Sequence, residues 1–311
     1  MVLREVLDLF DLLDSPKACG KDVASLFSSL GMSKVEVETL TGDKGKTDVV
    51  RITVPGTHGK SEGGDAPTLG ILGTLGGIGA RPELLGMVSD GDGALVSLAA
   101  GLKLARMHRK GDICRGDVIV ATHVCPNAPT APHEPTPFMG SPVNIFDQVR
   151  AEVSDEMDAI LSVDTTRGNR VINHKGFAIS PTVKEGYILR TSDDLLRIME
   201  SVTGDLPVVF PITTQDITPY GNGVYHINSI LQPSVIADCP VVGVAITARA
   251  AVAGCATGAS DPTCLESVSR FCVEVAKAFA QGACRLYDPV EFGRMKELYG
   301  SMNHLRTKGR L

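Results

Sequence analysis

The sequence lacks tryptophan and has few other aromatic residues, with five Tyr and nine Phe among 311 residues. Such a chain offers few rings on which nucleic-acid bases could stack. Acidic residues outnumber basic ones, the net charge is −6, and no basic stripe offsets this balance. Because nucleic acids and anionic membranes attract basic surfaces, neither is expected as a partner.

The sequence also lacks paired cysteines and long apolar runs. None of its eight cysteines lies in a Cys-x-x-Cys motif, so a thiolate zinc site or a redox pair is not expected. A long chain with no cysteine framework is typical of the reducing cytoplasm. Residues 1–14 do not resemble a signal peptide, and no apolar run reaches eighteen residues. These features predict a cytoplasmic protein without a membrane span.

What is present is ordinary globular composition, with 43% hydrophobic residues and enough length for a large core. Apolar runs predict buried strands at 68–72, 118–121, 158–163, 207–212 and 241–246, and helical periodicity predicts helices between several of them. Because no linker or repeat divides the chain, we expect one α/β domain over residues 1–311. Its expected architecture is three layers, α/β/α, around a mixed and largely parallel sheet.

A glycine-rich loop follows the first of these strands, from Gly73 to Arg81. Its spacing matches neither the Gly-x-Gly-x-x-Gly motif nor a Gly-Lys-Ser/Thr motif, which argues against a nucleotide site. The glycines are better explained by a close approach of the backbone around a site. Arg81 at the end of the loop is a candidate substrate-binding residue.

Polar side chains recur where predicted strands end. Asp90 and Asp92 lie in a turn before a helix, and His123, Asp164 and Asp216 each follow a strand. In open parallel sheets such residues meet at the carboxyl edge, where ligands bind. Each one also has a structural explanation: the first two could cap the helix, Asp164 and Asp216 could bind local amides, and His123 could be a buried hydrogen-bonded residue.

Taken together, these residues favour a metal site. Carboxylates and imidazoles without thiolates suit Zn²⁺ or Mn²⁺, which polarise a carbonyl and generate hydroxide. We expect Asp90 or Asp92 to bridge two ions and His123, Asp164 and Asp216 to ligate them. In the proline-rich loop, His133 and Glu134 are the catalytic candidates, with Glu134 as the base or a further ligand.

Further candidates would bind a polar small molecule or a small peptide. They are Lys184, a cation for a substrate carboxylate, and a cluster of hydrogen-bonding residues on glycine-rich backbone, namely Tyr220, Asn222, His226 and Asn228. Both groups could equally be solvated turns. Cys255 lies in a small-residue loop after the last strand, where it could act as a nucleophile, although no histidine is near it in the sequence.

Long motifs spread over most of the chain resemble a bacterial and archaeal family of unknown function. They begin at Leu75, Val88, Asp164, Ser180 and Gln215, and the last reads Gln-Asp-Ile-Thr-Pro-Tyr-Gly-Asn-Gly. This resemblance identifies the family but implies no established activity.

The layout is also remotely similar to the co-catalytic zinc aminopeptidases, which implies a phosphorylase/hydrolase-like α/β fold. The shared elements are an N-terminal helix at 3–14, the acidic turn at 90–93, His133-Glu134 and Asp164. Two features depart from that pattern. Gly73-Thr74-Leu75 replaces a His-x-Asp ligand motif, and residues 255–260 supply no C-terminal histidine ligand. The full two-zinc site therefore does not carry over, unless other histidines such as His123 and His226 replace the missing ligands.

The sequence leaves three functions open. The first is a metal-dependent hydrolase acting on an amide or peptide bond of a small peptide or amino-acid derivative. The second is a metal-independent isomerase or lyase using Cys255 or a His/Asp pair. The third is a non-catalytic small-molecule-binding protein with a peptidase-like fold. A homo-oligomer is compatible with the sequence.

Overall fold

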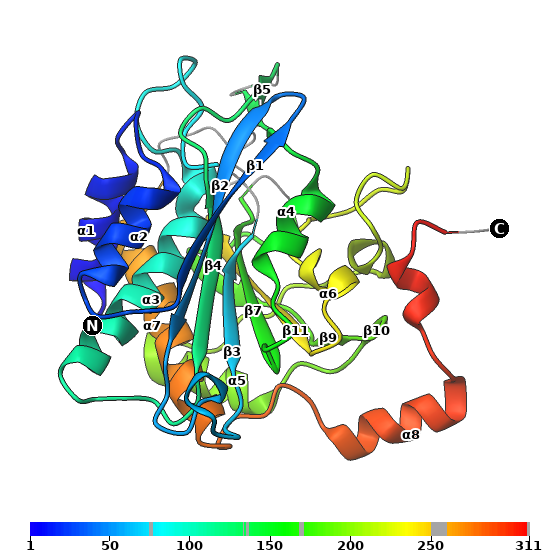
Figure 1. Cartoon of the computed structure of the whole chain (residues 1–311). Helices are drawn as coiled ribbons and strands as arrows, with labels where there is room; N and C mark the ends of the chain where they lie inside the picture. Colours follow the sequence, from blue (N-terminus) through cyan, green and yellow to red (C-terminus); the bar gives the residue numbers. More distant parts are fainter. Residues whose placement is uncertain (75–76, 133, 135–136, 168–170, 250–259, 310–311) are drawn as a thin grey trace.

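The computed structural model describes residues 1–74, 77–132, 134, 137–167, 171–249 and 260–309. A twisted sheet lies between two layers of helices, as Figure 1 shows. In the described residues the sheet contains nine strands: β1 (Val35–Gly42), β2 (Gly45–Val54), β3 (Leu69–Gly73), β4 (Val118–Val124), β7 (Ala159–Thr165), β8 (Gly176–Ile179), β9 (Val183–Lys184), β10 (Tyr187–Ile188) and β11 (Val241–Thr247). Two further short strands, β5 (Thr130–Ala131) and β6 (Phe138–Met139), pair with each other.

The sheet is parallel at its centre and antiparallel at both sides. Its strand order is β1-β2-β4-β3-β7-β11-β9-β10, with β8 also pairing with β11. The strands β4, β3, β7 and β11 run parallel, whereas the β1–β2 hairpin and the short strands β8, β9 and β10 are antiparallel. The predicted mixed α/β sheet is confirmed. Every residue of β3, β4 and β11 is buried, which agrees with parallel strands covered on both faces.

One predicted strand is absent. Residues 207–212 form only an isolated bridge between Val209 and Ile179, and they join no ladder of the sheet. Pro207 and Pro211 lack the N–H group that a sheet ladder needs, which explains why this apolar run does not become a strand. Asp216 therefore does not follow a strand of the parallel centre.

The helices form the two outer layers. On one face lie α1 (Leu3–Leu13), α2 (Gly20–Ser28), α3 (Asp92–Arg109), α5 (Asp193–Thr203) and α7 (Pro262–Ala280), whose apolar residues share one core with the sheet. The other face carries α4 (Ile145–Glu152) and α6 (Pro233–Ile236). The remaining helix, α8 (Pro289–Tyr299), extends beyond the sheet and buries mainly Phe292.

Alternate residues of the central strands pack into the cores on the two faces of the sheet. Val120, Leu161 and Val244 pack into the core beneath α3 and α7, and their neighbours Ile119, Ile160 and Ala245 pack into the core on the other side. This alternation follows from the two-residue repeat of a strand. It also means that residues near the strand ends, such as Asp164 after Val163, can face either layer.

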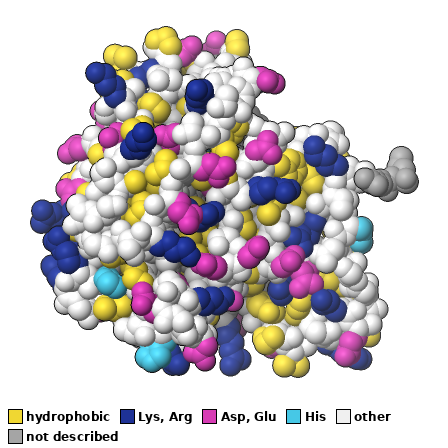
Figure 2. All heavy atoms as spheres, viewed as in Figure 1, with side chains coloured by type: hydrophobic (Ala, Val, Ile, Leu, Met, Phe, Trp, Pro, Cys, Tyr) yellow, Lys and Arg dark blue, Asp and Glu magenta, His cyan; other side chains and the backbone are white. Residues whose placement is uncertain are grey.

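The outer surface is mixed in charge. On the face shown in Figure 2, acidic and basic side chains are interspersed among apolar and neutral groups. None of the described helices is both long and apolar enough to cross a bilayer.

Candidate functional site

The candidate site forms where the carboxyl ends of β3 and β7 meet the beginning of α3. A methyl group at Gly93 would lie 2.6 Å from the carbonyl oxygen of Val163 and 3.3 Å from the Cα of Asp164. A methyl group at Gly73 would lie 2.6 Å from the Ser97 hydroxyl oxygen. Both of the 2.6 Å distances are too short for a side chain, so glycine at these positions lets the helix approach the strand ends.

This packing brings Asp90 and Asp164 together. Asp90 lies in η2 (Ser89–Gly91), the 3-10 turn before α3, and Asp164 is the penultimate residue of β7. The Thr165 hydroxyl donates to the Ser89 carbonyl at 2.7 Å and ties the two segments to each other. Asp90 and Asp164 are only 8% and 5% exposed.

The two carboxylates influence each other electrostatically. Burial, and then the negative charge of Asp90, hold the pKa of Asp164 well above its ordinary value, while a hydrogen bond from the Thr165 amide opposes them. Among the described residues Asp164 forms no ion pair. A buried pair of acids of this kind favours the uptake of a proton or a cation.

Asp92 meets a different environment, although it is two residues from Asp90. Its Oδ2 forms an ion pair of 2.7 Å with Nη1 of Arg167, and its Oδ1 accepts a hydrogen bond of 2.5 Å from Ser260. Both members of the ion pair are almost fully buried. Burial raises the pKa of Asp92 to about 6, against the opposing effect of the Arg167 charge. The charge of Asp92 is thus already balanced by the protein.

Neither acid caps the helix. Gly91 occupies the N-cap position of α3, and no side chain forms a capping hydrogen bond there. The capping explanation of this acidic turn is therefore wrong. The positive end of the α3 dipole nevertheless lies beside the turn and reduces the cost of burying negative charge.

A third buried carboxyl belongs to Glu152. Glu152 ends α4, is 0% exposed, and accepts a hydrogen bond of 3.1 Å from Gln148 through Oε1. Its Oε2 is buried and has no hydrogen-bond partner among the described residues. Burial raises the pKa of Glu152 to about 8. Its negative charge also raises the pKa of Asp164, by less than burial and the charge of Asp90 do.

The predicted five-residue metal set does not form one cluster. Within the described ranges, no three His, Cys, Asp or Glu side chains are grouped so that they could hold a metal ion. Asp90, Asp92, His123, Asp164 and Asp216 all lie inside those ranges. The described residues thus do not bring the five together in one cluster, and three of them have other partners. Their joint role as metal ligands stays a prediction.

His123 and Asp216 serve the fold instead. The strand predicted to end at 121 continues to Val124, so His123 lies within β4, fully buried, with its Nδ1 2.7 Å from the Thr47 hydroxyl. The Asp216 carboxylate accepts bonds from the Thr213 amide and hydroxyl at 2.8 and 3.0 Å, and from the Ile227 amide at 2.7 Å. It closes the loop around η3 (Thr214–Ile217). Asp92 likewise has a structural partner, in its ion pair with Arg167.

The predicted substrate-binding residues are dispersed. Arg81 donates to the carbonyl oxygens of Asp14 and Pro126, and joins the end of α1 to the loop after β4. Lys184 lies on β9, where it contacts the Tyr287 and Phe292 rings and donates to the Asp238 carbonyl at 2.7 Å. Each thus has a structural partner.

The cluster at 220–228 is largely bonded within its own loop. The Tyr220 and His226 rings contact each other, and Asn222 donates to the Thr218 hydroxyl at 2.9 Å. The exception is Asn228, whose side-chain amide atoms are buried and have no hydrogen-bond partner in the described part of the chain. Its assignment to substrate binding stays a prediction.

The described residues include only part of the predicted catalytic loop. Glu134 is exposed, and His133 lies outside the described residues, as does Cys255. The roles predicted for all three stay predictions.

Sequence reasoning missed Glu152, Arg167 and Ser260. Arg167 comes three residues after Asp164, a spacing that could have suggested a partner for one of the nearby acids. Glu152 gave no such signal, because its burial depends on how α4 packs against the sheet.

The described residues fit a divalent cation only in part. Asp90 and Asp164 supply neighbouring buried carboxylates, the hard oxygen ligands that Mn²⁺ and Mg²⁺ accept together with several waters. They do not supply the four ligands of a closed zinc site. A manganese- or magnesium-like ion therefore suits this pair better than structural zinc.

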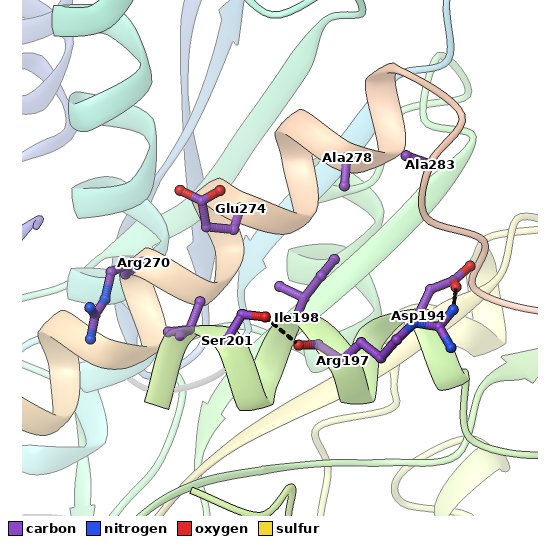
Figure 3. A pocket seen from close by; sticks show the side chains of 9 residues that line it. Asp194, Arg197, Ile198, Ser201, Arg270, Glu274, Ala278 and Ala283 are labelled. Atoms are coloured by element: carbon purple, nitrogen blue, oxygen red, sulfur yellow. Dashed lines mark hydrogen bonds and ion pairs between the residues drawn. The ribbon is translucent and has the colours of Figure 1, made fainter. Parts of the chain in front are cut away.

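A second cavity lies away from this site. It measures about 450 Å³ and lies between α5 and α7, and Figure 3 shows its lining. Its charged residues largely pair locally: Arg197 pairs with Asp194, and Arg270 pairs with Glu266. Apolar side chains such as Ile198 form the remainder of the wall.

Fold and site together define a three-layer α/β protein with buried acids at the carboxyl edge of its sheet. The chain belongs to the family described as "Protein of unknown function (DUF1177)", whose model matches residues 38–309. This confirms the predicted family. No curated protein matches the sequence.

A solved structure has a similar fold. It is the "Bottromycin maturation enzyme BotP in complex with Mn", matched at 15% identity with a TM-score of 0.54, over 90% of this chain and 71% of that one. At this identity the likeness shows the fold alone, and it confirms the predicted α/β class.

Proposed function

We propose that this protein is a hydrolase that cleaves an amide or peptide bond of a small peptide or amino-acid derivative with the help of a divalent cation. Asp90 and Asp164 would hold the cation. The observation that carries the proposal is their joint burial at the carboxyl edge of the sheet, where the charge of Asp90 raises the pKa of Asp164. A cation between them would replace a repulsion by two attractions.

The donor set favours Mn²⁺ over Zn²⁺, because both ligands are carboxylates and water would complete the coordination. A bound divalent cation supplies Lewis acidity toward the scissile carbonyl and a lowered pKa of water. The manganese present in the similar structure supports this choice of ion.

We assign proton transfer to Glu152 rather than to the exposed Glu134. The Glu152 side chain is held through Oε1 by Gln148, which in turn accepts a hydrogen bond from Ser141 at 3.2 Å. Its Oε2 has no hydrogen-bond partner among the described residues, and in this proposal that oxygen exchanges a proton with an attacking water or a leaving amine.

Metal binding tests the proposal directly. Metal-free protein should bind about one equivalent of Mn²⁺ in isothermal titration calorimetry, and Asp164→Asn and Asp90→Asn should each weaken binding at least tenfold. Asp193→Asn, at an exposed position in the first turn of α5, is the matched control and should bind as the wild type does. A panel of dipeptides and acylated amino acids, assayed with and without Mn²⁺, tests hydrolysis.

Two results would reject the proposal. One is the absence of stoichiometric Mn²⁺, Zn²⁺ or Mg²⁺ binding by the wild type. The other is turnover that does not depend on metal and disappears in Cys255→Ser, which would support the isomerase or lyase alternative. Ligand binding without any turnover would support the non-catalytic alternative.

A further inference from the structure

A large cleft opens at the same edge of the sheet as the two carboxylates. It has a volume of about 800 Å³ and lies between the start of β8, the end of α5, the loop at 205–208 and the start of α7. Gly176, which begins β8 and lines the cleft, pairs with Thr247 at the carboxyl end of β11. The volume is that of a site for a small ligand.

Consecutive residues join this cleft to the candidate site. Lys175 in the cleft wall forms an ion pair of 3.1 Å with Asp261, and the preceding residue, Ser260, donates to Asp92. Cys264, another wall residue, lies near enough for the charges of Arg167 and Asp92 to influence its pKa. These contacts connect the cleft wall to the acidic turn that carries Asp90 and Asp92.

The cleft has an apolar floor. Phe177 and Met199 are 1% and 2% exposed, and Val208 is partly buried beside them in the same core. Leu206, which is 83% exposed, adds an apolar side chain at the rim. Such a surface gains free energy when an apolar side chain of a ligand covers it.

The two cationic residues of the cleft differ in their partners. Arg249 is exposed at its wall and forms no ion pair with any residue that the structure describes. Lys175 shares its charge with Asp261, and Asp205 is the acidic residue of the lining. A guanidinium binds a carboxylate through two parallel hydrogen bonds, so Arg249 is the group that would recognise it.

We propose that this cleft binds the apolar residue of the substrate that carries a free carboxylate. The inference rests on the proposed function and deepens it: the substrate class becomes small peptides or acylated amino acids with an apolar, carboxylate-terminated residue. Peptides whose terminal carboxylate is converted to an amide leave Arg249 without a partner and bind weakly.

A matched pair of probes tests the cleft without any need for turnover. N-acetyl-leucine should bind the wild-type protein at least tenfold more tightly than N-acetyl-leucinamide, as followed by heteronuclear NMR titration. The shifted amide signals should belong to residues 174–177 and 203–208. Arg249→Met should weaken N-acetyl-leucine binding about tenfold and leave the amide unchanged, and Arg249→Lys should restore part of the loss.

Arg109→Met is the control, because Arg109 is an exposed arginine at the end of α3 that does not line the cleft. The inference is overturned if Arg249→Met binds N-acetyl-leucine as tightly as Arg109→Met does, or if both probes bind equally well. Repeating the titration with Asp164→Asn separates the two proposals. Preserved N-acetyl-leucine binding in Asp164→Asn would show that the cleft acts independently of the carboxylate pair. Wild-type protein that binds this probe but hydrolyses none of the panel would reject the hydrolase and retain the cleft.

Discussion

Two acids in one turn, Asp90 and Asp92, have different neighbours. Asp92 is buried against Arg167 and Ser260, so its charge is balanced within the protein. Asp90 acts instead on Asp164, another buried acid for which the described residues provide no ion-pair partner. The comparison teaches that burial alone does not mark a functional acid. A balancing cation makes Asp92 a structural acid, whereas Asp164, without one among the described residues, is suited to binding an ion.

The largest expected effect comes from breaking the balanced pair. Arg167→Met should lower the free energy of unfolding by about 3–5 kcal/mol, because it leaves Asp92 buried without its cation. Urea denaturation at pH 7 measures this loss. The double variant Asp92→Leu/Arg167→Met removes both charges and should recover most of the stability, whereas additive losses would contradict a direct pairing.

The pH dependence of stability tests the isolated carboxyl of Glu152. Its pKa is raised from 4.5 to about 8, so over this interval the folded protein retains a proton that the unfolded chain has released. The free energy of unfolding of the metal-free protein should therefore fall as the pH rises from about 4.5 to about 8, by about 1.4 kcal/mol per unit at most.

Glu152→Gln should remove this part of the slope, since glutamine does not titrate. Glu134→Gln, at an exposed position, should leave the slope as it is in the wild type. Identical pH profiles for Glu152→Gln and the wild type would show that Glu152 is not a buried, proton-retaining carboxyl.

The pair of acids Asp90 and Asp164 should respond in the opposite direction from the ion pair of Asp92. In metal-free protein at pH 7, Asp164→Asn should raise the free energy of unfolding by about 1 kcal/mol, because it removes a buried charge beside Asp90. Thermal denaturation with and without Mn²⁺ measures the effect. With Mn²⁺ present the order should reverse, since binding stabilises only the wild type. A destabilised metal-free variant would contradict the comparison.

An effect on stability as small as that of Asp164→Asn is expected at Asp216, with none on metal binding. Asp216→Asn should lower the free energy of unfolding by about 1 kcal/mol, because the amide replaces an acceptor-only carboxylate that binds several main-chain and hydroxyl donors. Its affinity for Mn²⁺ should equal that of the wild type. Loss of metal binding in this variant would show that Asp216 is a metal ligand after all.

The sheet was more predictable from the sequence than the site. Apolar runs at 118–121, 158–163 and 241–246 coincide with β4, β7 and β11 to within one residue at their starts, because burial on both faces demands such runs. The run at 207–212 has the same apolar character, but its prolines keep it out of the ladders. An apolar run thus predicted a strand correctly where its residues can donate the backbone hydrogen bonds of a sheet, and failed where prolines cannot.

The site depended on contacts between distant segments. Asp90 and Asp164 were among the predicted residues, since both follow from the rule that ligands bind at the carboxyl edge. The residues that surround these acids were not predictable from spacing. Ser260, which donates to Asp92, is 168 residues away in the sequence, and Glu152 is buried by the packing of α4. The hydrogen bonds that Asp216 accepts within its own loop were likewise not predictable from spacing.

The close approach at Gly93 has a consequence for how this edge could have evolved. The Cα of Gly93 rests against the last residues of β7, and a single added methyl group would collide with the Val163 carbonyl oxygen. Alanine there would lift the start of α3 from the strand and carry the neighbouring turn with it. Because Gly93 has no side chain, the turn that carries Asp90 can lie close to Asp164, and the size of the ion that the two acids would hold in the proposed function depends on this residue.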